Sequence, residues 1–483
     1  MKILFIVNTK DLGFEEPLGA LYLSSAAKRR GHDVRAVENE LTSVEAKIAG
    51  FRPDLLAMSV LTPSFPYLYR LLRDVKRRHK IPSIVGGPHA THFPEILKEE
   101  GIDYVFRGEG EISFLKFLDR FEKGAAMDDC ENLSYMKDGQ MRSNPLAPFV
   151  EDLDSVAFPD RELLGGYRQF TESDVRSVMA SRGCPYQCSY CFNNQYQGMY
   201  KDLGKRLRLR SVDNVVAECK ALKGRYGARM IHFFDDIFPF KPAWVEEFAE
   251  KYKAEVGLPF LTNTSFNVCS EQYVSALARA GCKCLLIGVE TGNEYFREKI
   301  LFRKMKNSMM VECAKLVHSH GIRIYTQNLI GLPHGSLELD IETLRVNIAL
   351  KADYAGAYLC QPYPGTPIEA IAKEAGLFDA DKEFNRSFYY SSKIKIADRE
   401  KVERLRILFP IVVNFPALHN FIYLFLRFPS GPWGVIGKLL HGYKIKSAIL
   451  RYNMSARSFI NHTKLFFRRP INRMVLEEKA GEP

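Results

Sequence analysis

Three thiols crowd into one short segment, Cys184-Pro185-Tyr186-Gln187-Cys188-Ser189-Tyr190-Cys191, which follows a predicted strand at residues 176–179. Thiolates are the usual protein ligands of iron–sulfur clusters, and three on one loop can hold a cube whose fourth iron stays open. A structural zinc site would need a fourth ligand, and no further Cys or His lies close by in the sequence. A disulfide is disfavoured by the odd count, and coincidence remains an alternative. We predict an iron–sulfur cluster here.

The residues after this segment alternate between short apolar runs and amphipathic stretches, which is typical of parallel α/β structure. The predicted strands are residues 176–179, 230–234, 284–288, 323–326 and 355–359, with helical spacing over residues 212–223 and 270–280. About six strand–helix units fit into the region, whereas a closed eight-unit barrel takes ~250 residues. We therefore predict an open, partial barrel of the TIM type.

The first 120 residues show the same alternation. The predicted strands are residues 3–7, 34–37, 55–60, 83–85 and 104–106, with a helix over residues 18–30. This pattern predicts a small doubly wound sheet, and ligands of such sheets bind beyond the carboxyl ends of the strands. Small residues follow several of these strands, including Gly86-Gly87-Pro88-His89 and Gly108-Glu109-Gly110-Glu111. Tight turns alone would also explain these glycines.

The cysteine segment, with its C-x-x-x-C-x-x-C spacing after a strand, resembles the signature of the radical S-adenosylmethionine (SAM) superfamily. Further segments resemble that family in the correct order: residues 233–238 with Asp235-Asp236, residues 288–292 with Glu290, residues 328–333 and residues 361–367. The resemblance implies a 4Fe-4S cluster on Cys184, Cys188 and Cys191, and a SAM site formed by Tyr190, Asp235, Asp236, Glu290, Asn328 and Gly331. An alternative for Asp235-Asp236 is the N-cap of a helix that opens near Pro242.

The N-terminal sheet resembles the cobalamin-binding domain that precedes the barrel in cobalamin-dependent radical SAM enzymes. The resemblance implies that cobalamin is bound by Leu18, Gly19, Thr62, Gly86, Gly87, Pro88, His89, Gly108, Glu109 and Gly110. The Asp-x-His-x-x-Gly motif that supplies a cobalt ligand in mutase-type domains is absent. Cobalt would then be bound without a histidine, or the domain no longer binds cobalamin. A lone histidine such as His89 is more often a hydrogen-bonding loop residue than a metal ligand.

The resemblance implies a C-methyltransferase that uses SAM twice, as methyl donor through methylcobalamin and as the source of a 5′-deoxyadenosyl radical. One alternative is a cobalamin-dependent oxidative cyclase or rearrangement enzyme without methyl transfer. A second alternative is a non-catalytic cobalamin or iron–sulfur sensor, which would have no need of a SAM site. We expect a small-molecule or lipid-like substrate and an external electron donor such as flavodoxin or ferredoxin.

Composition and charge set the remaining expectations. The chain has 483 residues, 46% of them apolar and 26% charged, which excludes a disordered protein and predicts several domains. We predict a cobalamin-binding domain at 1–130, a linker at 131–170, the radical SAM barrel at 171–375 and a helical basic region at 376–483. No secretory signal pattern opens the chain, and the ten cysteines are too few for a disulfide scaffold. We expect a cytoplasmic protein.

The net charge of +11 is concentrated near the C-terminus, where residues 417–483 carry eleven Lys and Arg and three Glu. Apolar residues at helical spacing lie among these charges, including Phe421, Phe425 and Leu439. Basic amphipathic helices can lie on an anionic membrane, so peripheral membrane association is one expectation. The alternative is ordinary packing of these helices under the barrel with a solvated basic face. We expect no nucleic acid partner.

Overall fold

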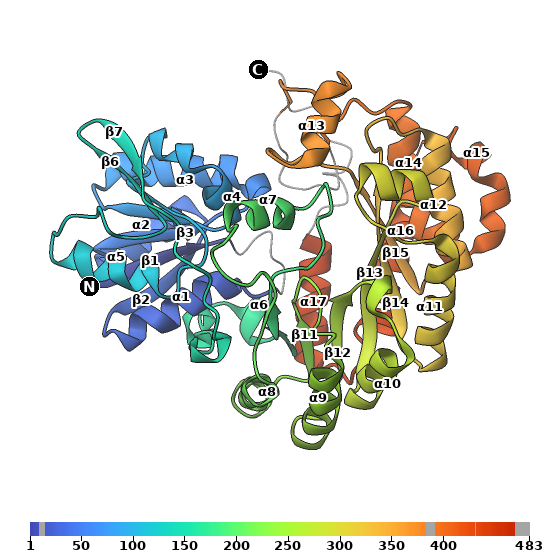
Figure 1. Ribbon diagram of the computed structural model, residues 1–483, viewed down its shortest axis with the longest axis horizontal. Coiled ribbons are helices and arrows are strands. Elements are labelled where there is room, and N and C mark those ends of the chain that lie inside the picture. The colour runs from blue at the N-terminus through green and yellow to red at the C-terminus, as the bar shows by residue number, and fades with distance from the viewer. Residues whose placement is uncertain (9–14, 383–391, 430, 469–483) are drawn as a thin grey trace. The chain divides into compact units, whose positions relative to one another are not determined.

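The computed structural model describes residues 1–8, 15–382, 392–429 and 431–468 (Figure 1). Contacts divide the chain into two compact units. The first comprises Met1–Glu172 with Gly198–Lys205, and the second comprises Ser173–Gln197 with Arg206–Pro483. Within the predicted region 376–483, residues 383–391, 430 and 469–483 lie outside the described residues. Each unit has its own sheet and is described by itself.

The first unit is built on a seven-stranded sheet with the order β2-β1-β3-β4-β5-β6-β7. Its strands are β1 (Lys2–Val7), β2 (Asp33–Glu38), β3 (Leu55–Ser59), β4 (Ser83–Gly86), β5 (Tyr104–Phe106), β6 (Leu133–Lys137) and β7 (Gln140–Ser143). Its helices are α1 (Leu18–Arg29), α2 (Leu41–Phe51), α3 (Phe65–Arg78), α4 (Pro88–His92), α5 (Ser113–Glu122) and α6 (Arg168–Thr171). Strands β1 to β5 are parallel, and every residue from Ile3 to Val7 is buried, as in strands covered on both faces. The predicted doubly wound sheet is confirmed.

A β-hairpin extends this sheet where the sequence predicts a linker. Strand β6 pairs antiparallel with β5 and with β7, so residues 133–143 belong to the sheet rather than to the predicted linker 131–170. Asp138 and Gly139 form the turn, with φ of 52° and 74°. Asp-Gly is a strong two-residue hairpin signal, and the nearby prolines obscure it. The rest of the range contains only the short helices η3 (Leu153–Ser155), η4 (Arg161–Leu164) and α6.

The second unit is built on six parallel strands in the order β15-β14-β13-β12-β11-β8. They are β8 (Val175–Val178), β11 (Met230–Phe233), β12 (Phe260–Thr264), β13 (Cys282–Glu290), β14 (Arg323–Ile330) and β15 (Tyr354–Leu359). The helices between them are α8 (Val212–Tyr226), α9 (Pro242–Glu255), α10 (Glu271–Ala280), α11 (Asn307–Ser319) and α12 (Leu337–Ala349). Five of the strands are predicted from the sequence, and the predicted partial barrel is confirmed. Strand β12 is missed, although its two β-branched Thr residues favour a strand.

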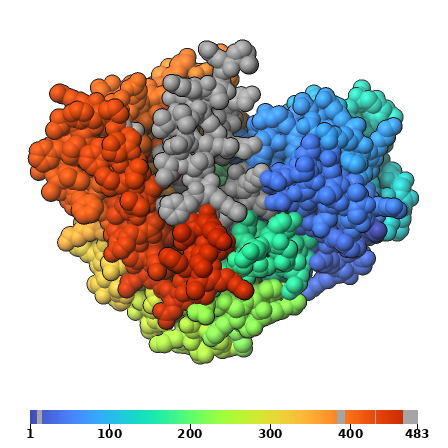
Figure 2. All heavy atoms as spheres, turned by 180° about the vertical axis from the view of Figure 1, so that it is seen from behind, coloured from blue at the N-terminus to red at the C-terminus, as the bar shows by residue number. Residues whose placement is uncertain are grey.

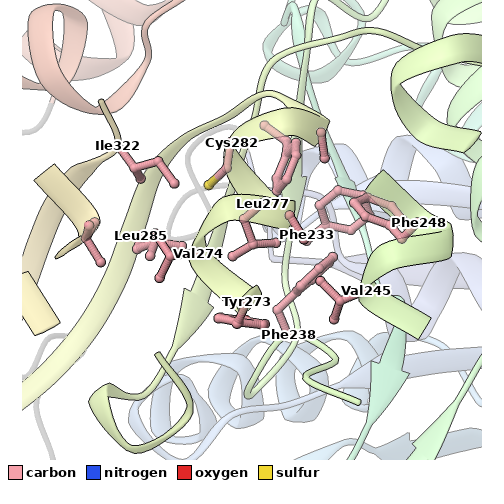
Figure 3. Packing of buried hydrophobic residues seen from close by; sticks show 14 of the residues in the cluster. Phe233, Phe238, Val245, Phe248, Tyr273, Val274, Leu277, Cys282, Leu285 and Ile322 are labelled. Carbon is pink, nitrogen blue, oxygen red and sulfur yellow. The ribbon is translucent and has the colours of Figure 1, made fainter. Parts of the chain in front are cut away.

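The outer face of this sheet packs against the helices. Figure 3 shows Phe233 and Leu285 from the strands against Val245 and Phe248 from α9 and Leu277 from α10. The inner face has a separate core, because one cluster combines Val175, Met230, Leu261, Cys284 and Tyr354 from five strands with Ile449 and Leu450. Since this cluster joins both edge strands, it lies inside the curved sheet. Ile449 and Leu450 of the C-terminal region thus fill the barrel interior near the N-terminal ends of the strands.

The C-terminal region is helical, as predicted. Its elements are α14 (Arg399–Asn414), η7 (Pro416–Phe421), α15 (Ile422–Phe425), α16 (Gly431–Lys444), η8 (Ile445–Ile449) and α17 (Ala456–Arg468). Helix α14 packs on β15 and α12 through Leu405, Phe409 and Val412, so this helix covers the last strand. Figure 2 shows these helices in orange and red. Within the described residues, no helix is both long and apolar enough to cross a membrane.

Candidate cofactor-binding site

The cysteine loop follows β8 and lies between the short strand β9 (Ser181–Arg182) and helix α7 (Phe192–Met199). Cys188 is buried, and Cys184 and Cys191 are half-buried. Burial raises the pKa of Cys184 to about 11 and that of Cys191 to about 12. These thiols therefore stay protonated near neutral pH until a cation such as iron binds them, which deprotonates a coordinating thiol outright.

Hydrogen bonds from a nearby side chain hold the backbone of the loop. The Gln197 side chain donates to the carbonyl oxygens of Cys184 (2.6 Å) and Tyr186 (3.1 Å), and Arg206 donates to the Gln197 oxygen at 2.8 Å. Gly183 has φ of 89°, and a Cβ there would lie 1.9 Å from the Arg206 carbonyl oxygen. Only glycine fits that position, so the approach to the first cysteine is sterically fixed.

The three thiols suit a cluster better than a single ion. Among the residues that the structure describes, no three His, Cys, Asp or Glu side chains converge on a point where one metal ion could bind. A four-iron cube takes its three thiolates at three different corners, so they need not converge on one point. Cys184, Cys188 and Cys191 stay the predicted cluster ligands, three thiols on one loop.

The adjacent carboxylates Asp235 and Asp236 follow β11 and have different surroundings. Asp235 is fully buried and accepts hydrogen bonds from the Ser181 hydroxyl (2.5 Å) and the Ala180 N–H (3.2 Å). Burial raises its pKa to about 7. The Asp235 carboxyl group thus anchors the chain that leads into the cysteine loop. Neither carboxyl group caps α9, whose N-cap is Lys241, so the alternative of a helix cap is wrong.

Asp236 keeps an exposed side chain next to the cysteine loop. Its carboxylate acts through space on the thiols of Cys184 and Cys191, raising the pKa of each. Protein atoms that displace water raise the pKa of Asp236 itself, and the nearby Asn193 side chain opposes this. Of the two carboxylates, Asp236 is the one that remains open to a cationic ligand.

Glu290 ends β13 and is buried, with φ of 66°. Its Oε1 accepts a hydrogen bond from the Tyr190 hydroxyl at 2.8 Å, so a residue of the cysteine loop meets the end of β13. Burial raises the pKa of Glu290, and the nearby Arg303 opposes this. A Cβ at Gly288 would lie 2.1 Å from the Glu290 Oε1, so a side chain there would displace the Glu290 carboxylate.

Arg303 is a site residue that the sequence does not reveal. Its Nη1 lies 3.4 Å from the Cys188 Sγ and 3.3 Å from the Tyr190 hydroxyl, and its Nη2 donates to the Gly288 carbonyl oxygen at 3.0 Å. It lies in an irregular, lysine-rich segment without periodicity, where no motif signals it. The structure brings Cys188, Tyr190, Glu290 and Arg303 together.

Asn328 and Gly331 have structural contacts within the barrel wall. The Asn328 side chain is fully buried and bonds to Asn347 (2.7 Å) and to the Gly356 carbonyl oxygen (2.9 Å). Its polar atoms are thus already used within the protein. Gly331 has φ of 68°, and its N–H donates to both carboxyl oxygens of Asp340 at 3.2 Å. Any contact of these two residues with SAM would come from the backbone.

His232 is a second polar residue that the sequence analysis does not single out. It lies two residues after Met230 on β11 and therefore faces the same inner side of the sheet. Its Nε2 is buried without a hydrogen-bond partner, and burial lowers the pKa of His232 to about 4. A neutral imidazole in the barrel interior can donate or accept a hydrogen bond with a bound molecule.

The predicted cobalamin residues lie at loops of the first unit, after β3, β4 and β5 and at the start of α1. Close contacts surround three of the five glycines. A Cβ at Gly87 would meet Val60 backbone atoms at 2.8 and 2.9 Å, a Cβ at Gly108 would lie 1.6 Å from the Tyr200 hydroxyl, and a Cβ at Gly110 would meet Leu23 at 2.9 Å. A Cβ at Gly19 would meet nothing within 4 Å, and one at Gly86 would make only ordinary contacts.

The remaining predicted cobalamin residues also have contacts within the unit. The His89 Nδ1 lies 3.2 Å from the Thr62 hydroxyl, and its ring packs on Phe65. Burial lowers the pKa of His89 to about 4, so it is neutral. The Glu109 carboxylate accepts the Val150 N–H at 3.0 Å, Leu18 is buried, and Pro88 opens α4. His89 thus contacts the neighbouring loop through Thr62, which is the hydrogen-bonding role given above as the alternative to metal ligation.

Asp340→Asn is expected to reduce the pH dependence of stability. Burial raises the pKa of Asp340 to about 7, so the folded protein keeps a proton that the unfolded chain releases near pH 4. This contribution is complete below about pH 4 and is lost as the pH rises through about 7, by an amount on the order of a few kcal/mol. Denaturant unfolding at about pH 5 and 8 should show a larger loss of unfolding free energy for the wild type than for the variant. Equal losses would contradict it.

Comparison with known proteins identifies both units. Residues 178–345 match the radical SAM superfamily model, and residues 6–118 match the B12 binding domain model. The chain belongs to the cobalamin-dependent radical SAM enzymes. The family implies a 4Fe-4S cluster, SAM and cobalamin as the cofactors of this radical SAM enzyme.

Relatives and solved structures agree with this family. An uncharacterized methyltransferase of Pyrococcus horikoshii is 27% identical over 383 residues, covering 76% of this chain and 82% of that protein. An anaerobic magnesium-protoporphyrin IX monomethyl ester cyclase of Rubrivivax gelatinosus is 25% identical, covering 86% of this chain and 77% of the cyclase. The radical SAM methyltransferase TsrM of Kitasatospora setae, solved with cobalamin and a 4Fe-4S cluster, matches with a TM-score of 0.65 and 18% identity over 79% of each chain. This radical SAM enzyme shares the fold of TsrM.

Proposed function

We propose that this radical SAM enzyme is a C-methyltransferase that uses SAM both as methyl donor and as radical source. The observation that carries the proposal is the cysteine loop, with Asp236 and the Tyr190–Glu290 pair beside it, in a chain that also has a B12 binding domain. The methyltransferase relative supports it. When bound, the cluster supplies the electron for SAM cleavage and cobalamin serves as the methyl carrier.

Different residues of the second unit bind different parts of SAM. Asp236 binds the ammonium group of the methionine part, because its carboxylate is open beside the cysteine loop. Glu290 accepts hydrogen bonds from the ribose hydroxyls, with Tyr190 fixing its orientation through the 2.8 Å hydrogen bond. Asp235 orients the loop, and the backbone near Asn328 and Gly331 flanks the adenine. His232 offers a neutral polar contact to a substrate in the barrel interior.

The first unit would bind cobalamin at the loops after β3, β4 and β5. Thr62, Gly86 and the segment Gly108-Glu109-Gly110 lie at these loops, and the start of α1 at Leu18-Gly19 completes the set. The open surface at Gly19 and the ordinary contacts at Gly86 leave these two as the glycines where a ligand rather than protein packing could exclude a side chain. Gly87→Val, by contrast, would strain the protein itself.

Product analysis distinguishes the proposed reaction from the alternative. With its substrate present, the reconstituted enzyme is expected to form S-adenosylhomocysteine and 5′-deoxyadenosine in near-equal amounts, because each turnover uses one SAM for methyl and one for the radical. A deuterated SAM methyl group should appear on a product carbon by mass spectrometry. Cobalamin-free enzyme is the control and should lose S-adenosylhomocysteine formation. 5′-Deoxyadenosine with an oxidised or cyclised product and no label would instead support a cyclase, as in the Rubrivivax relative.

A small-molecule substrate and an external one-electron reductant are the partners that this chemistry requires. All ten cysteines are free thiols, which fits a cytoplasmic location.

The C-terminal region adds a candidate membrane contact. Phe421, Phe428 and Leu439 are exposed by 55, 55 and 62% of their surface, and the exposed Arg427 and Lys446 flank them. We propose that this face contacts an anionic membrane, where apolar and basic side chains both gain.

Phe421→Asp and Leu439→Asp are each expected to weaken binding to anionic vesicles severalfold without unfolding the protein, because neither side chain is in the core. Co-sedimentation with vesicles at low and high salt checks this, since salt screens the basic contribution. Ile112→Asp, an equally exposed apolar residue of the first unit, is the control. Absence of vesicle binding by the wild type would leave the C-terminal helices with ordinary packing alone.

A further inference from the structure

We infer that Arg303 is a positioning residue for the iron–sulfur cluster. Its guanidinium holds the Cys188 sulfur in place and supplies the positive charge that compensates the cluster and its thiolates. The inference rests on the cluster alone and not on methyl transfer. It is carried by the 3.4 Å contact from the Arg303 Nη1 to the Cys188 Sγ, and by the hydrogen bond that fixes Nη2 on the Gly288 carbonyl oxygen.

The charge of Arg303 lies near one carboxylate, that of Glu290, because both side chains contact the Tyr190 hydroxyl. A guanidinium stays protonated in proteins, so the half-buried Arg303 keeps its positive charge among these groups. Its polar contacts are the Cys188 sulfur, the Tyr190 hydroxyl and the Gly288 carbonyl, with the Met305 sulfur at 4.0 Å. Its Nε is buried without a hydrogen bond. Glu290 thus supplies one nearby negative charge, and the thiolates of a bound cluster would supply further negative charge on the Cys188 side.

Arg297 is a natural comparison six residues earlier. It is fully buried, whereas Arg303 is half-buried, and it donates to carbonyl oxygens of Thr291 and Met305 and to the Asn307 side-chain oxygen. None of its contacts is a sulfur atom. The two arginines thus share a chain segment, and they differ in burial and in what they contact. Arg297 holds the backbone together, whereas Arg303 faces a cluster ligand.

Two consequences follow for the cluster. Reduction adds one negative charge, so a fixed neighbouring cation favours the reduced form and raises the reduction potential. The contact also connects the cluster loop to the nucleotide side of the site, because Arg303 donates to the Tyr190 hydroxyl and Tyr190 donates to Glu290. Arg303 thereby fixes the position of Cys188 relative to the carboxylate proposed to bind the ribose.

Redox titration of the reconstituted cluster, followed by electron paramagnetic resonance, tests the charge. Arg303→Gln is expected to lower the ratio of reduced to oxidised cluster at a fixed potential by about tenfold, which is about 59 mV for one electron. Arg303→Lys keeps a cation and should stay within about threefold of wild type. Arg297→Gln is the matched control, with lower thermal stability and an unchanged ratio. An unchanged ratio in an iron-loaded Arg303→Gln variant would overturn the inference.

A second measurement applies even if Arg303→Gln fails to fold or to bind iron. Protein with ¹⁵N-labelled arginine should show a weak nitrogen coupling to the reduced cluster in pulsed resonance spectra. The coupling should vanish in Arg303→Lys and persist in Arg297→Lys. Absence of coupling in the wild type, or persistence in Arg303→Lys, would overturn the contact. Neither measurement involves methyl transfer, so a failure of the proposed function would leave this test intact.

Discussion

Cys188→Ala is expected to abolish both the iron–sulfur cluster and all reductive cleavage of SAM. The cluster depends on three thiolates, and the remaining two cannot hold the cube with one iron open to SAM. Cys184→Ala and Cys191→Ala should have the same effect. Iron content, the brown charge-transfer absorption and 5′-deoxyadenosine formation after anaerobic reconstitution measure the result. The loss should be complete rather than graded.

Cys282→Ala is the control for the cysteine variants. Cys282 is buried in the outer core of the barrel, where its thiol donates to the Cys284 carbonyl oxygen at 3.6 Å. Its removal leaves a small cavity and should cost about 1 kcal/mol of stability while iron content stays at the wild-type level. Loss of iron from Cys282→Ala with retention by Cys188→Ala would refute the assignment of the cluster ligands.

Asp236→Asn is expected to weaken SAM binding by about 10- to 100-fold, the range of a hydrogen bond to a charged group. The carboxylate is open beside the cysteine loop, so its neutral analogue loses the ammonium without disturbing the fold. Asp235→Asn should mainly lower thermal stability, because Asp235 accepts hydrogen bonds from Ser181 and Ala180. Its effect on the affinity for SAM should be smaller. Titration of SAM against the oxidised cluster, with thermal unfolding alongside, separates the two.

The comparison between the two aspartates also tests the roles assigned to them. An Asp235→Asn variant with wild-type stability and weaker SAM binding than Asp236→Asn would reverse the assignment. Equal effects in both variants would mean that the carboxylates act as one unit on SAM. The experiment needs no methyl acceptor, because binding is measured on the oxidised cluster.

The sequence predicts the cluster ligands and both sheets because these features are local. Three cysteines in eight residues and short apolar runs signal their structure without any long-range information. The division of work between Asp235 and Asp236 could not be predicted, since it depends on Ser181, more than fifty positions earlier in the chain. Arg303 could not be predicted either, because only folding brings it to Cys188. Both are consequences of tertiary packing.

The glycine-rich loops of the first unit show the opposite limit. The glycine pattern predicts that Gly87, Gly108 and Gly110 admit a ligand, yet neighbouring protein atoms also exclude a side chain at Gly87 and Gly108. A glycine pattern therefore cannot distinguish ligand access from close packing of the chain on itself. Strand β12 and the β6–β7 hairpin have local signals in Thr262 and Asp138-Gly139. Stronger polar and proline patterns in the neighbouring sequence mask these signals.

The placement of Ile449 and Leu450 inside the barrel has a consequence for how such enzymes diversify. Ile449 and Leu450, together with Ile445, Tyr452 and Met454, line the end of the barrel chamber that lies opposite the cysteine loop. The depth of that chamber, and hence the length of molecule it admits, can then change through mutations in the tail alone. The cofactor machinery at the rim would be inherited untouched while the tail sets which acceptor fits.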